Sequence, residues 1–461
     1  MFNKYSIADI QQKMINHEMD PIDIAEECSN RYFLTEPLVK AWVCFDPKAL
    51  FEKVESIRTK IQKRELLRPL DGVPVGIKDI FNTIDFPTQM GSPLWKNFTP
   101  GNDARPVYYI KNSGGAVVGK TITAEFAVHA LNETLNPHDS RFTPGTSSSG
   151  SAVAVSAGVV PVALGTQTAG SIIRPASFCG VYAFKPSFGL IPRTGTLKTT
   201  DSLDTIGFFT AFPADLKRVF EILRVRGPNF PFSHNALSDS QRQTKSDGER
   251  WRIAFVKTYT WNDTADYAKN GINELISRIA NIVNVDVSEV ELPNTMDKCH
   301  FVHESIYNKT LSYYFKEEKL NSHLVSEIMN VLIESGNNIS TKAYHDSLRD
   351  QCDIINIMDK FFDNYDIIIS LSTAGSAPLR NDFEIADPCL MWTLSHLPVI
   401  NIPAFISPTK MPFGAQILAR KYNDLLLLNF LDVLQSNAIV PKSCNPTPAF
   451  LDYSHSSSKA N

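Results

Sequence analysis

The chain has 461 residues, of which 43% are hydrophobic and 20% are charged, and its formal net charge at pH 7 is -4. This composition is typical of a soluble globular protein with room for a large core. The slightly acidic balance gives no electrostatic footprint for a nucleic acid or an anionic membrane, so we exclude both and expect a small-molecule partner.

The N-terminus and the cysteines favour a cytoplasmic location. Residues 1–20 form a polar helical pattern that lacks the basic start and apolar run of a secretion signal. No segment approaches the roughly 18 uninterrupted apolar residues of a membrane span. The seven cysteines are scattered and free of CxxC spacing, which favours reduced thiols over a disulfide framework or a zinc site.

The first part of the chain predicts helices and then α/β units. Apolar positions recur at helical spacing over 5–35 and 46–65. The short apolar run VGIKDI that follows is a predicted strand carrying Lys78, and a helix from residue 104 leads to a strand over 116–118 and to Lys120. A buried ammonium must be paired or lose its proton, so a lysine that reaches solvent from a sheet edge is the simpler interpretation of each. Spacing alone does not show which of the two lysines, Lys78 or Lys120, is the better candidate for a functional role.

The segment 144–186 is the most unevenly composed part of the chain. It begins with a hydroxyl run, Thr146 to Ser149, whose composition alone is that of a flexible linker. The run continues directly into SAVAVSAGVVPVALG, which predicts a tightly packed helix and then a strand. The hydroxyls would therefore lie at a helix N-terminus, where backbone N–H groups lack partners. A second turn of small residues ends at Ser171 and lets a ligand approach the backbone closely.

The second half predicts mixed structure. Residues 224–249 are polar and turn-rich and predict a surface connection, and residues 297–363 are strongly helical. A further helix is predicted over 265–282. The tail from Ser443 is expected to be loosely ordered. Strands are predicted over 251–256, 285–292, 366–370, 397–403 and 414–418.

Several common catalytic motifs are absent from the sequence. The chain has no HExxH, no GxSxG elbow, no phosphate loop and no GxGxxG near its α/β units. A lysine can replace histidine as a base when desolvation lowers its pKa. A serine cluster, a turn offering backbone N–H groups and a lysine on a strand would together supply a nucleophile, an oxyanion hole and a base, without metal or cofactor.

The segment PGTSSSGSA to LGTQTAGSIIRPASFCGVYAFKPS resembles the amidase signature family, and blocks from GVPVGIKDI to MPFGAQILA resemble it in the same order. Residues 225–360 match only in their helical character. The resemblance implies an α/β fold with a central mixed, twisted β-sheet covered by helices on both faces. It also implies one domain, 1–461, comprising an N-terminal helical region (1–66), a catalytic core (67–215), a variable, mostly helical region (225–363) and resumed core strands (364–436).

The catalytic set of that family is a serine nucleophile, a second serine after a cis peptide bond, and a lysine. Matched motif by motif, the nucleophile falls on Ser171, the bridging serine on Ser147 and the base on Lys78. The separation of the two serines along the chain is the family's spacing, which favours Ser147 over Ser148 and Ser149. By the same alignment Lys120 is not the catalytic lysine.

The resemblance implies acyl transfer. Neutral Lys78 would draw a proton through Ser147 while Ser171 attacks the amide carbonyl, and water would hydrolyse the acyl-enzyme. The oxyanion would be held by the backbone N–H groups of Thr168, Ala169, Gly170 and Ser171.

The motif GTQTAGSIIRPA is similar to the malonamidase branch, in which an arginine at the position of Arg174 holds a substrate carboxylate. Arg174, with Thr166 and Ser148, is therefore the implied substrate-binding set. The competing interpretation is that Arg174 pairs with an internal acid. The family often reads GTDTGGS, so Gln167 and Ala169 are departures, and Thr146 replaces a glycine.

The implied function is an amidohydrolase that cleaves the C–N bond of a small linear amide, with a homodimer left open as the assembly. One alternative is a biosynthetic acyltransferase that passes the acyl group to an amine. A second is the glutamine-amide transfer subunit of a tRNA amidotransferase, whose TDTGG and GSIR patterns this chain lacks. A third is a non-catalytic binding relative.

Overall fold

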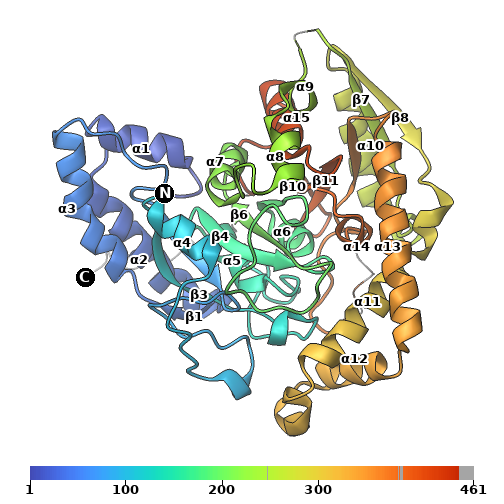
Figure 1. Cartoon of the computed structure of the whole chain (residues 1–461). Coiled ribbons are helices and arrows are strands. Elements are labelled where there is room, and N and C mark those ends of the chain that lie inside the picture. The colour runs from blue at the N-terminus through green and yellow to red at the C-terminus, as the bar shows by residue number, and fades with distance from the viewer. Residues whose placement is uncertain (247, 383, 385–387, 446–461) are drawn as a thin grey trace.

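The computed structural model describes residues 1–246, 248–382, 384 and 388–445. Their strands form one 11-stranded mixed sheet in the order β1-β3-β2-β4-β6-β5-β10-β11-β9-β7-β8. Strands from the first and last hundred residues thus belong to the same sheet (Figure 1). The predicted mixed α/β sheet is confirmed.

The N-terminal region contains α1 (Ile7–Ile15), α2 (Pro21–Val39), β1 (Trp42–Phe45) and α3 (Lys48–Gln62). Ser6 caps α1 and Asp20 caps α2, each in a capping box with an aspartate three positions later. The region 1–66, which the sequence predicted to be helical, also contains one strand, because β1 pairs antiparallel with β3 at the edge of the sheet. A four-residue strand is too short to show a period of its own.

The central region supplies the middle of the sheet. Its strands are β2 (Pro74–Lys78), β3 (Ala116–Thr121), β4 (Val162–Gln167), β5 (Tyr182–Lys185) and β6 (Thr205–Thr210). Its helices are η1 (Pro93–Trp95), α4 (Arg105–Asn112), η2 (Glu125–Ala127), α5 (Ser149–Ser156), α6 (Ile173–Cys179) and α7 (Pro213–Leu223). β2 pairs in parallel with both β3 and β4, and all three strands are buried throughout. Helices therefore cover both faces here, as parallel strands require.

Successive side chains of β6 point to opposite faces of the sheet, and their contacts show which helices cover each face. The ring of Phe208 contacts that of Phe184, which contacts Phe220 of α7, so this face lies under α7. The neighbouring Gly207 faces the other way, because a Cβ there would meet Ile172 at the start of α6. α5 packs beside α6 in that second layer.

The remaining strands extend the sheet and are β7 (Trp251–Val256), β8 (Val285–Val290), β9 (Ile367–Leu371), β10 (Val399–Ile406) and β11 (Pro412–Ala419). The helices are α8 (Pro231–Ser238), α9 (Ser240–Gln243), η3 (Trp261–Asp263), α10 (Asp266–Ala280), η4 (Asn294–Lys298), α11 (Cys299–Tyr314), η5 (Glu318–Leu324), α12 (Glu327–Asn337), α13 (Thr341–Phe361), α14 (Leu390–Leu394) and α15 (Asp424–Ser436). α11 packs against α12, α13 and α14 beside the sheet (Figure 1).

One prediction for this half needs correction. Residues 224–249 contain the short helices α8 and α9, where the sequence predicted a connection of turns. Proline at the start of α8 and an Asp239 cap before α9 begin these helices, although both residue types also favour turns. Most of the tail predicted from Ser443, residues 446–461, lies outside the described residues.

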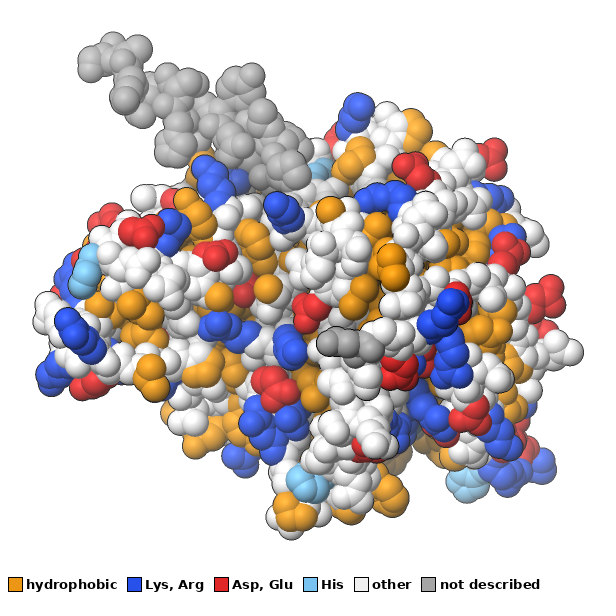
Figure 2. Space-filling view, turned by 90° about the horizontal axis from the view of Figure 1, so that it is seen from above, with side chains coloured by type: hydrophobic (Ala, Val, Ile, Leu, Met, Phe, Trp, Pro, Cys, Tyr) orange, Lys and Arg blue, Asp and Glu red, His pale blue; other side chains and the backbone are white. Residues whose placement is uncertain are grey.

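Within the described ranges, no helix is both long enough and apolar enough to cross a bilayer. The face seen from above carries interspersed basic and acidic side chains (Figure 2). None of the seven cysteines, all of which are among the described residues, is in a disulfide.

Candidate active site

Lys78 ends β2 in the interior of the molecule and has an exposed fraction of 0%. Its Nζ donates to three hydroxyl oxygens: Ser147 Oγ at 2.8 Å, Ser148 Oγ at 3.0 Å and Thr166 Oγ1 at 3.0 Å. Burial lowers its pKa from 10.5 to about 7, against a smaller opposing effect of the Asp204 carboxylate. The interpretation of a solvent-reaching edge lysine is therefore wrong, and a neutral amine is accessible near pH 7.

Lys120 is equally buried but has a different environment. Its Nζ lies 3.0 Å from Asp79 Oδ1 and donates to the carbonyls of Phe81 and Pro87 and to Thr88 Oγ1. Lys120 therefore holds the segment that follows β2, and its Nζ makes no hydrogen bond to the serines among the described residues. The two lysines that spacing could not rank are thus distinguished by their partners: an acid for Lys120 and hydroxyls for Lys78.

Ser147 lies just before α5, and the Thr146–Ser147 peptide bond is cis. Its hydroxyl is the shortest contact of Lys78 Nζ. Ser148 is fully buried and its Oγ donates to the carbonyl of Thr166. The two residues expected to contact substrate, Ser148 and Thr166, therefore have Lys78 as a partner, which makes them supports of the lysine in this structure.

Ser171 lies in the turn between β4 and α6, and Gln167 organises that turn. Gln167 Oε1 accepts hydrogen bonds from the N–H groups of Ile172 (2.8 Å) and Ile173 (2.9 Å), which satisfies donors at the start of α6. Its Nε2 donates to Thr393 Oγ1, which in turn donates to the carbonyl of Ala169. A glutamine can do both because its amide carries an acceptor and a donor, whereas the family's aspartate only accepts.

The same turn presents unused backbone donors. Among the described residues, nothing accepts a hydrogen bond from the N–H groups of Ala169, Gly170 or Ser171. The carbonyls of Thr168, Ala169 and Gly170 are instead tied to His303, Thr393 and the N–H of Arg174. A turn whose carbonyls are fixed and whose N–H groups are available can stabilise an oxyanion.

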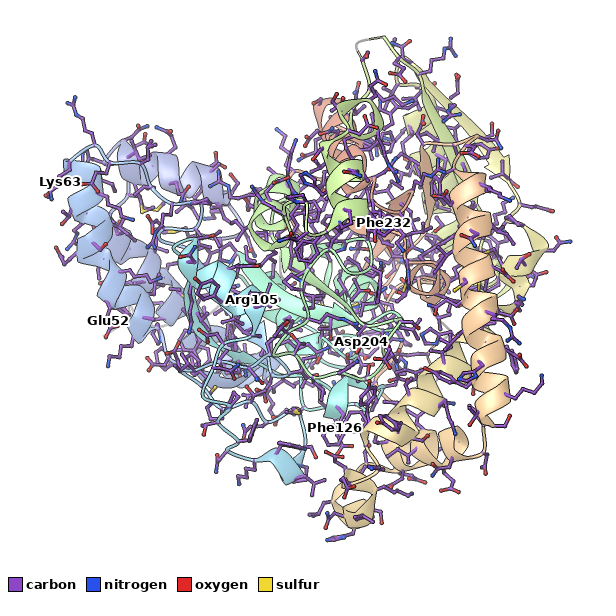
Figure 3. All side chains as sticks on the ribbon, viewed as in Figure 1. Glu52, Lys63, Arg105, Phe126, Asp204 and Phe232 are labelled. Atoms are coloured by element: carbon purple, nitrogen blue, oxygen red, sulfur yellow. The ribbon has the colours of Figure 1, made fainter. Side chains whose placement is uncertain are left out.

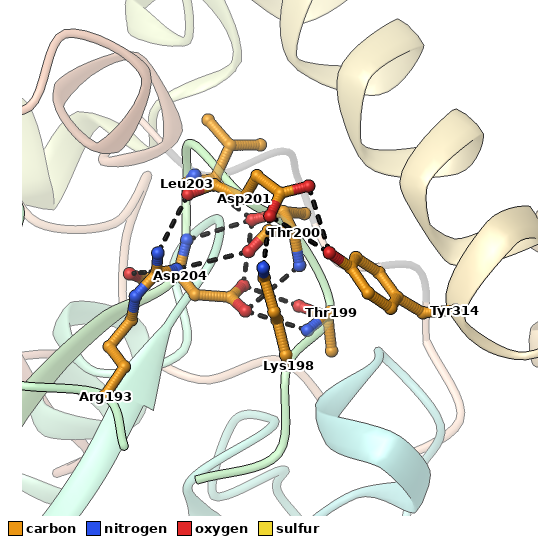
Figure 4. Close-up of polar contacts among 8 residues, drawn as sticks. All are labelled: Arg193, Lys198, Thr199, Thr200, Asp201, Leu203, Asp204 and Tyr314. Carbon is orange, nitrogen blue, oxygen red and sulfur yellow. Dashed lines mark hydrogen bonds and ion pairs between the residues drawn. The ribbon is translucent and has the colours of Figure 1, made fainter.

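Asp204 is a buried residue that anchors the turn through Thr168, and it lies near the middle of the molecule in the view of Figure 3. Its carboxylate accepts hydrogen bonds from the hydroxyls of Thr168, Thr199 and Thr200 and from two backbone N–H groups. The guanidinium of Arg193 binds the neighbouring carbonyls of Thr200 and Asp204 (Figure 4). The sequence showed no local signal for Asp204 beyond the block LDTIGFF.

Arg174 has an internal acid as a partner, which is the competing interpretation of this residue. Its Nη1 lies 3.2 Å from Glu384 Oε2, and its Nη2 donates to the carbonyl of Thr146 at 2.8 Å. Nη2 also lies 3.0 Å from His129 Nδ1. A guanidinium can only donate, so Nδ1 of His129 is the acceptor and its Nε2 carries the proton. Arg174 is thus bonded to the peptide group that precedes Ser147.

The helix α11, for which the sequence indicated no site residue, also reaches this turn. His303 Nε2 donates to the carbonyl of Thr168 at 2.8 Å, and burial lowers the pKa of this imidazole to about 4. His303 is 135 positions after Thr168 in the sequence, so no local motif connects the two. A metal site is not found among the described side chains.

Known proteins resemble this chain in sequence and in fold. A glutamyl-tRNA(Gln) amidotransferase subunit of Staphylococcus epidermidis is 28% identical over 466 aligned residues, covering 92% of this chain and 95% of the relative. A peptide amidase of Stenotrophomonas maltophilia shares the fold with a TM-score of 0.79 at 23% identity, covering 95% of this chain and 98% of that one. A protein from a vestigial complex related to an s-triazine catabolic enzyme aligns with a TM-score of 0.85 at 24% identity, covering 95% and 100%.

The family comparison covers most of the chain. The profile of the amidase family matches residues 23–428, which include Lys78, both serines and Gln167. The chain therefore belongs to the amidase signature family.

Proposed function

We propose that this protein is an amidohydrolase that cleaves the C–N bond of a small amide through an acyl-enzyme on Ser171. The observation that carries the proposal is the contact of Lys78 Nζ with Ser147 Oγ at 2.8 Å, in an environment that lowers the lysine pKa to about 7. Membership of the amidase family supports the same reaction class. A general base is most effective when its pKa lies near the working pH.

In the proposed reaction, neutral Lys78 accepts the Ser147 hydroxyl proton while Ser147 accepts that of Ser171. The oxygen of Ser171 forms a bond to the amide carbon, and the carbonyl oxygen becomes an oxyanion facing the unused N–H groups of Ala169, Gly170 and Ser171. The proton returns through Ser147 to the amide nitrogen as the C–N bond breaks. Water then attacks the ester by the same relay, which releases a carboxylic acid and restores Ser171.

We further propose that the substrate carries a carboxylate, which Arg174 would bind. Glu384 has an exposed fraction of 25% and contacts the guanidinium at Nη1, so a substrate carboxylate would compete with it at this nitrogen. Such an exchange would keep the buried guanidinium, whose side chain has an exposed fraction of 6%, paired with a carboxylate throughout. The malonamidase-like motif around Arg174 supports this assignment.

Acyl transfer to an amine is the second candidate. It is favoured by the similarity to the amidotransferase subunit, which extends over 92% of this chain. The first half-reaction would be the same, because the two functions differ only in whether water or an amine reaches the acyl-enzyme. A cytoplasmic location and a homodimer remain predictions from the sequence.

The decisive experiment is a screen of small amides, carboxylated and neutral, with Ser171→Ala as the control. We expect turnover by the wild type, labelling of Ser171 by a fluorophosphonate probe, and neither in the variant. Product analysis with and without added amines separates hydrolysis from transfer. Turnover that persists in Ser171→Ala, or a wild-type Ser171 that resists the probe, would contradict the proposed function.

A further inference from the structure

One face of α11 covers the candidate active site. His303 on this face bonds the carbonyl of Thr168, and Tyr314 near the end of the helix donates to the carboxylate of Asp201 (Figure 4). Tyr307 lies one helical turn after His303, on the same face, and their ring centroids are 5.7 Å apart. The helix therefore places Tyr307 beside His303, which bonds the turn that carries Ser171.

Tyr307 has a buried side chain whose surroundings include two charged groups of the candidate site, Asp204 and Arg174. Its side chain has an exposed fraction of 6%, and burial is the main cause of its raised phenol pKa. The carboxylate of Asp204 raises this pKa further, and the guanidinium of Arg174 lowers it. Both groups are thus within electrostatic reach of the phenol: one holds Thr168, and the other holds the Thr146 carbonyl.

The hydroxyl of Tyr307 is the feature of this residue that points to a ligand. Within the described part of the chain this hydroxyl makes no hydrogen bond. Its oxygen is also not fully sealed from solvent, although the side chain as a whole is buried. The raised pKa keeps the phenol protonated at neutral pH, so the group can donate. Buried tyrosine hydroxyls usually have a partner, and because the described residues supply none here, a bound molecule or water can take that place.

Resting on the proposed function, we propose that Tyr307 is a specificity-determining residue that donates a hydrogen bond to an acceptor oxygen in the acyl part of the substrate, beyond the scissile amide. The acceptor is a carboxylate or carbonyl oxygen that lies between the phenol and Arg174. Nε2–H of His129, whose Nδ1 is bound to Arg174, is a second donor beside the same guanidinium. Substrates without such an oxygen leave the phenol unpaired.

The first test compares succinamate with butanamide, which differ in a terminal carboxylate against a terminal methyl group. We expect Tyr307→Phe to reduce the preference for succinamate, measured as the ratio of the two kcat/KM values, by about 10-fold, mainly through KM, as loss of a hydrogen bond to a charged group predicts. Tyr313→Phe is the matched control, because this tyrosine is on the same helix and is 69% exposed. An unchanged preference in Tyr307→Phe, or an equal loss in Tyr313→Phe, overturns the proposal.

The second test measures binding without turnover. Calorimetry with succinamate on Ser171→Ala and on Ser171→Ala/Tyr307→Phe should show a Kd about 10-fold higher for the double variant. A Kd within about twofold, or no binding by Ser171→Ala, overturns the role of Tyr307. Fluorophosphonate labelling of wild-type Ser171 reports the proposed function separately, so failure of either idea is distinguishable from failure of the other.

Discussion

The hydroxyl of Thr168 donates to Oδ1 of Asp204 at 2.8 Å, which ties the turn of Ser171 to the loop that follows residue 198. The same carboxylate raises the pKa of Lys78 in opposition to burial. One buried acid therefore acts on both the turn that would hold the oxyanion and the proposed base. This double connection makes Asp204 the most informative residue outside the motif-derived set.

Replacing Asp204 by Asn should lower kcat by about 10- to 100-fold, because an amide oxygen cannot accept the five hydrogen bonds that the carboxylate accepts. The acidic limb of the pH profile should also move to lower pH, since a group that raises the pKa of Lys78 is lost. Asp201→Asn on the same loop is the control and should keep both properties. An acidic limb that stays in place in Asp204→Asn would contradict the proposed coupling.

Replacing Lys78 by Met should lower kcat by about 1,000-fold or more, since the proposed base is removed and the volume is kept. Lys185→Met is a closely matched control, because Lys185 is also fully buried and burial lowers its pKa to about 7 as well. Its Nζ binds the carbonyls of Pro186 and Leu397 and touches no proposed catalytic residue. Steady-state rates on folded protein check this, and comparable losses in the two variants would count against a specific role for Lys78.

The pH dependence of the wild type follows from the pKa of Lys78. Because the amine must be neutral to act as base, kcat/KM should rise with pH up to about 7 and level off above it. A profile that is flat between about pH 5 and pH 9 would exclude a lysine base with this pKa.

The lowered pKa of Lys78 should also make the free energy of unfolding depend on pH. The folded-state pKa of about 7 is below the ordinary value of 10.5, so between these values the unfolded chain binds the extra proton. The free energy of unfolding of the wild type, relative to Lys78→Met, should therefore increase with pH in this window by up to about 1.4 kcal/mol per pH unit. Below about pH 7 the difference should be constant. Urea titrations at several pH values measure it.

Glu384→Gln tests whether Arg174 is available to a substrate. The variant removes the charge that competes at Nη1, while the contacts of Arg174 with Thr146 do not involve Glu384. We expect the preference for succinamate over butanamide to increase by about 10-fold, whereas Arg174→Ala should abolish it. If both variants reduce the turnover of the two amides equally, Arg174 positions the Thr146–Ser147 peptide and does not select substrate.

Much of the proposed site could be predicted from the sequence because its parts are local motifs. Ser147 lies in a hydroxyl run before a small-residue helix, and Ser171 lies in a turn of small residues, so each is marked by its own neighbours. The strand pattern around Lys78 likewise predicted β2. Short elements such as β1, α8 and α9 were missed or misassigned, since a few residues carry no periodic signal.

The sequence by itself determined the family motifs, the mixed α/β class and the candidate residues Lys78, Ser147 and Ser171. Only the tertiary structure decided that Lys78 has hydroxyl partners while Lys120 has an acid, that Arg174 meets Glu384, and that α11 covers the turn of Ser171. The physical reason is that the pKa and availability of a side chain depend on its burial and partners. Many of those partners come from segments far away along the chain, which no local pattern connects.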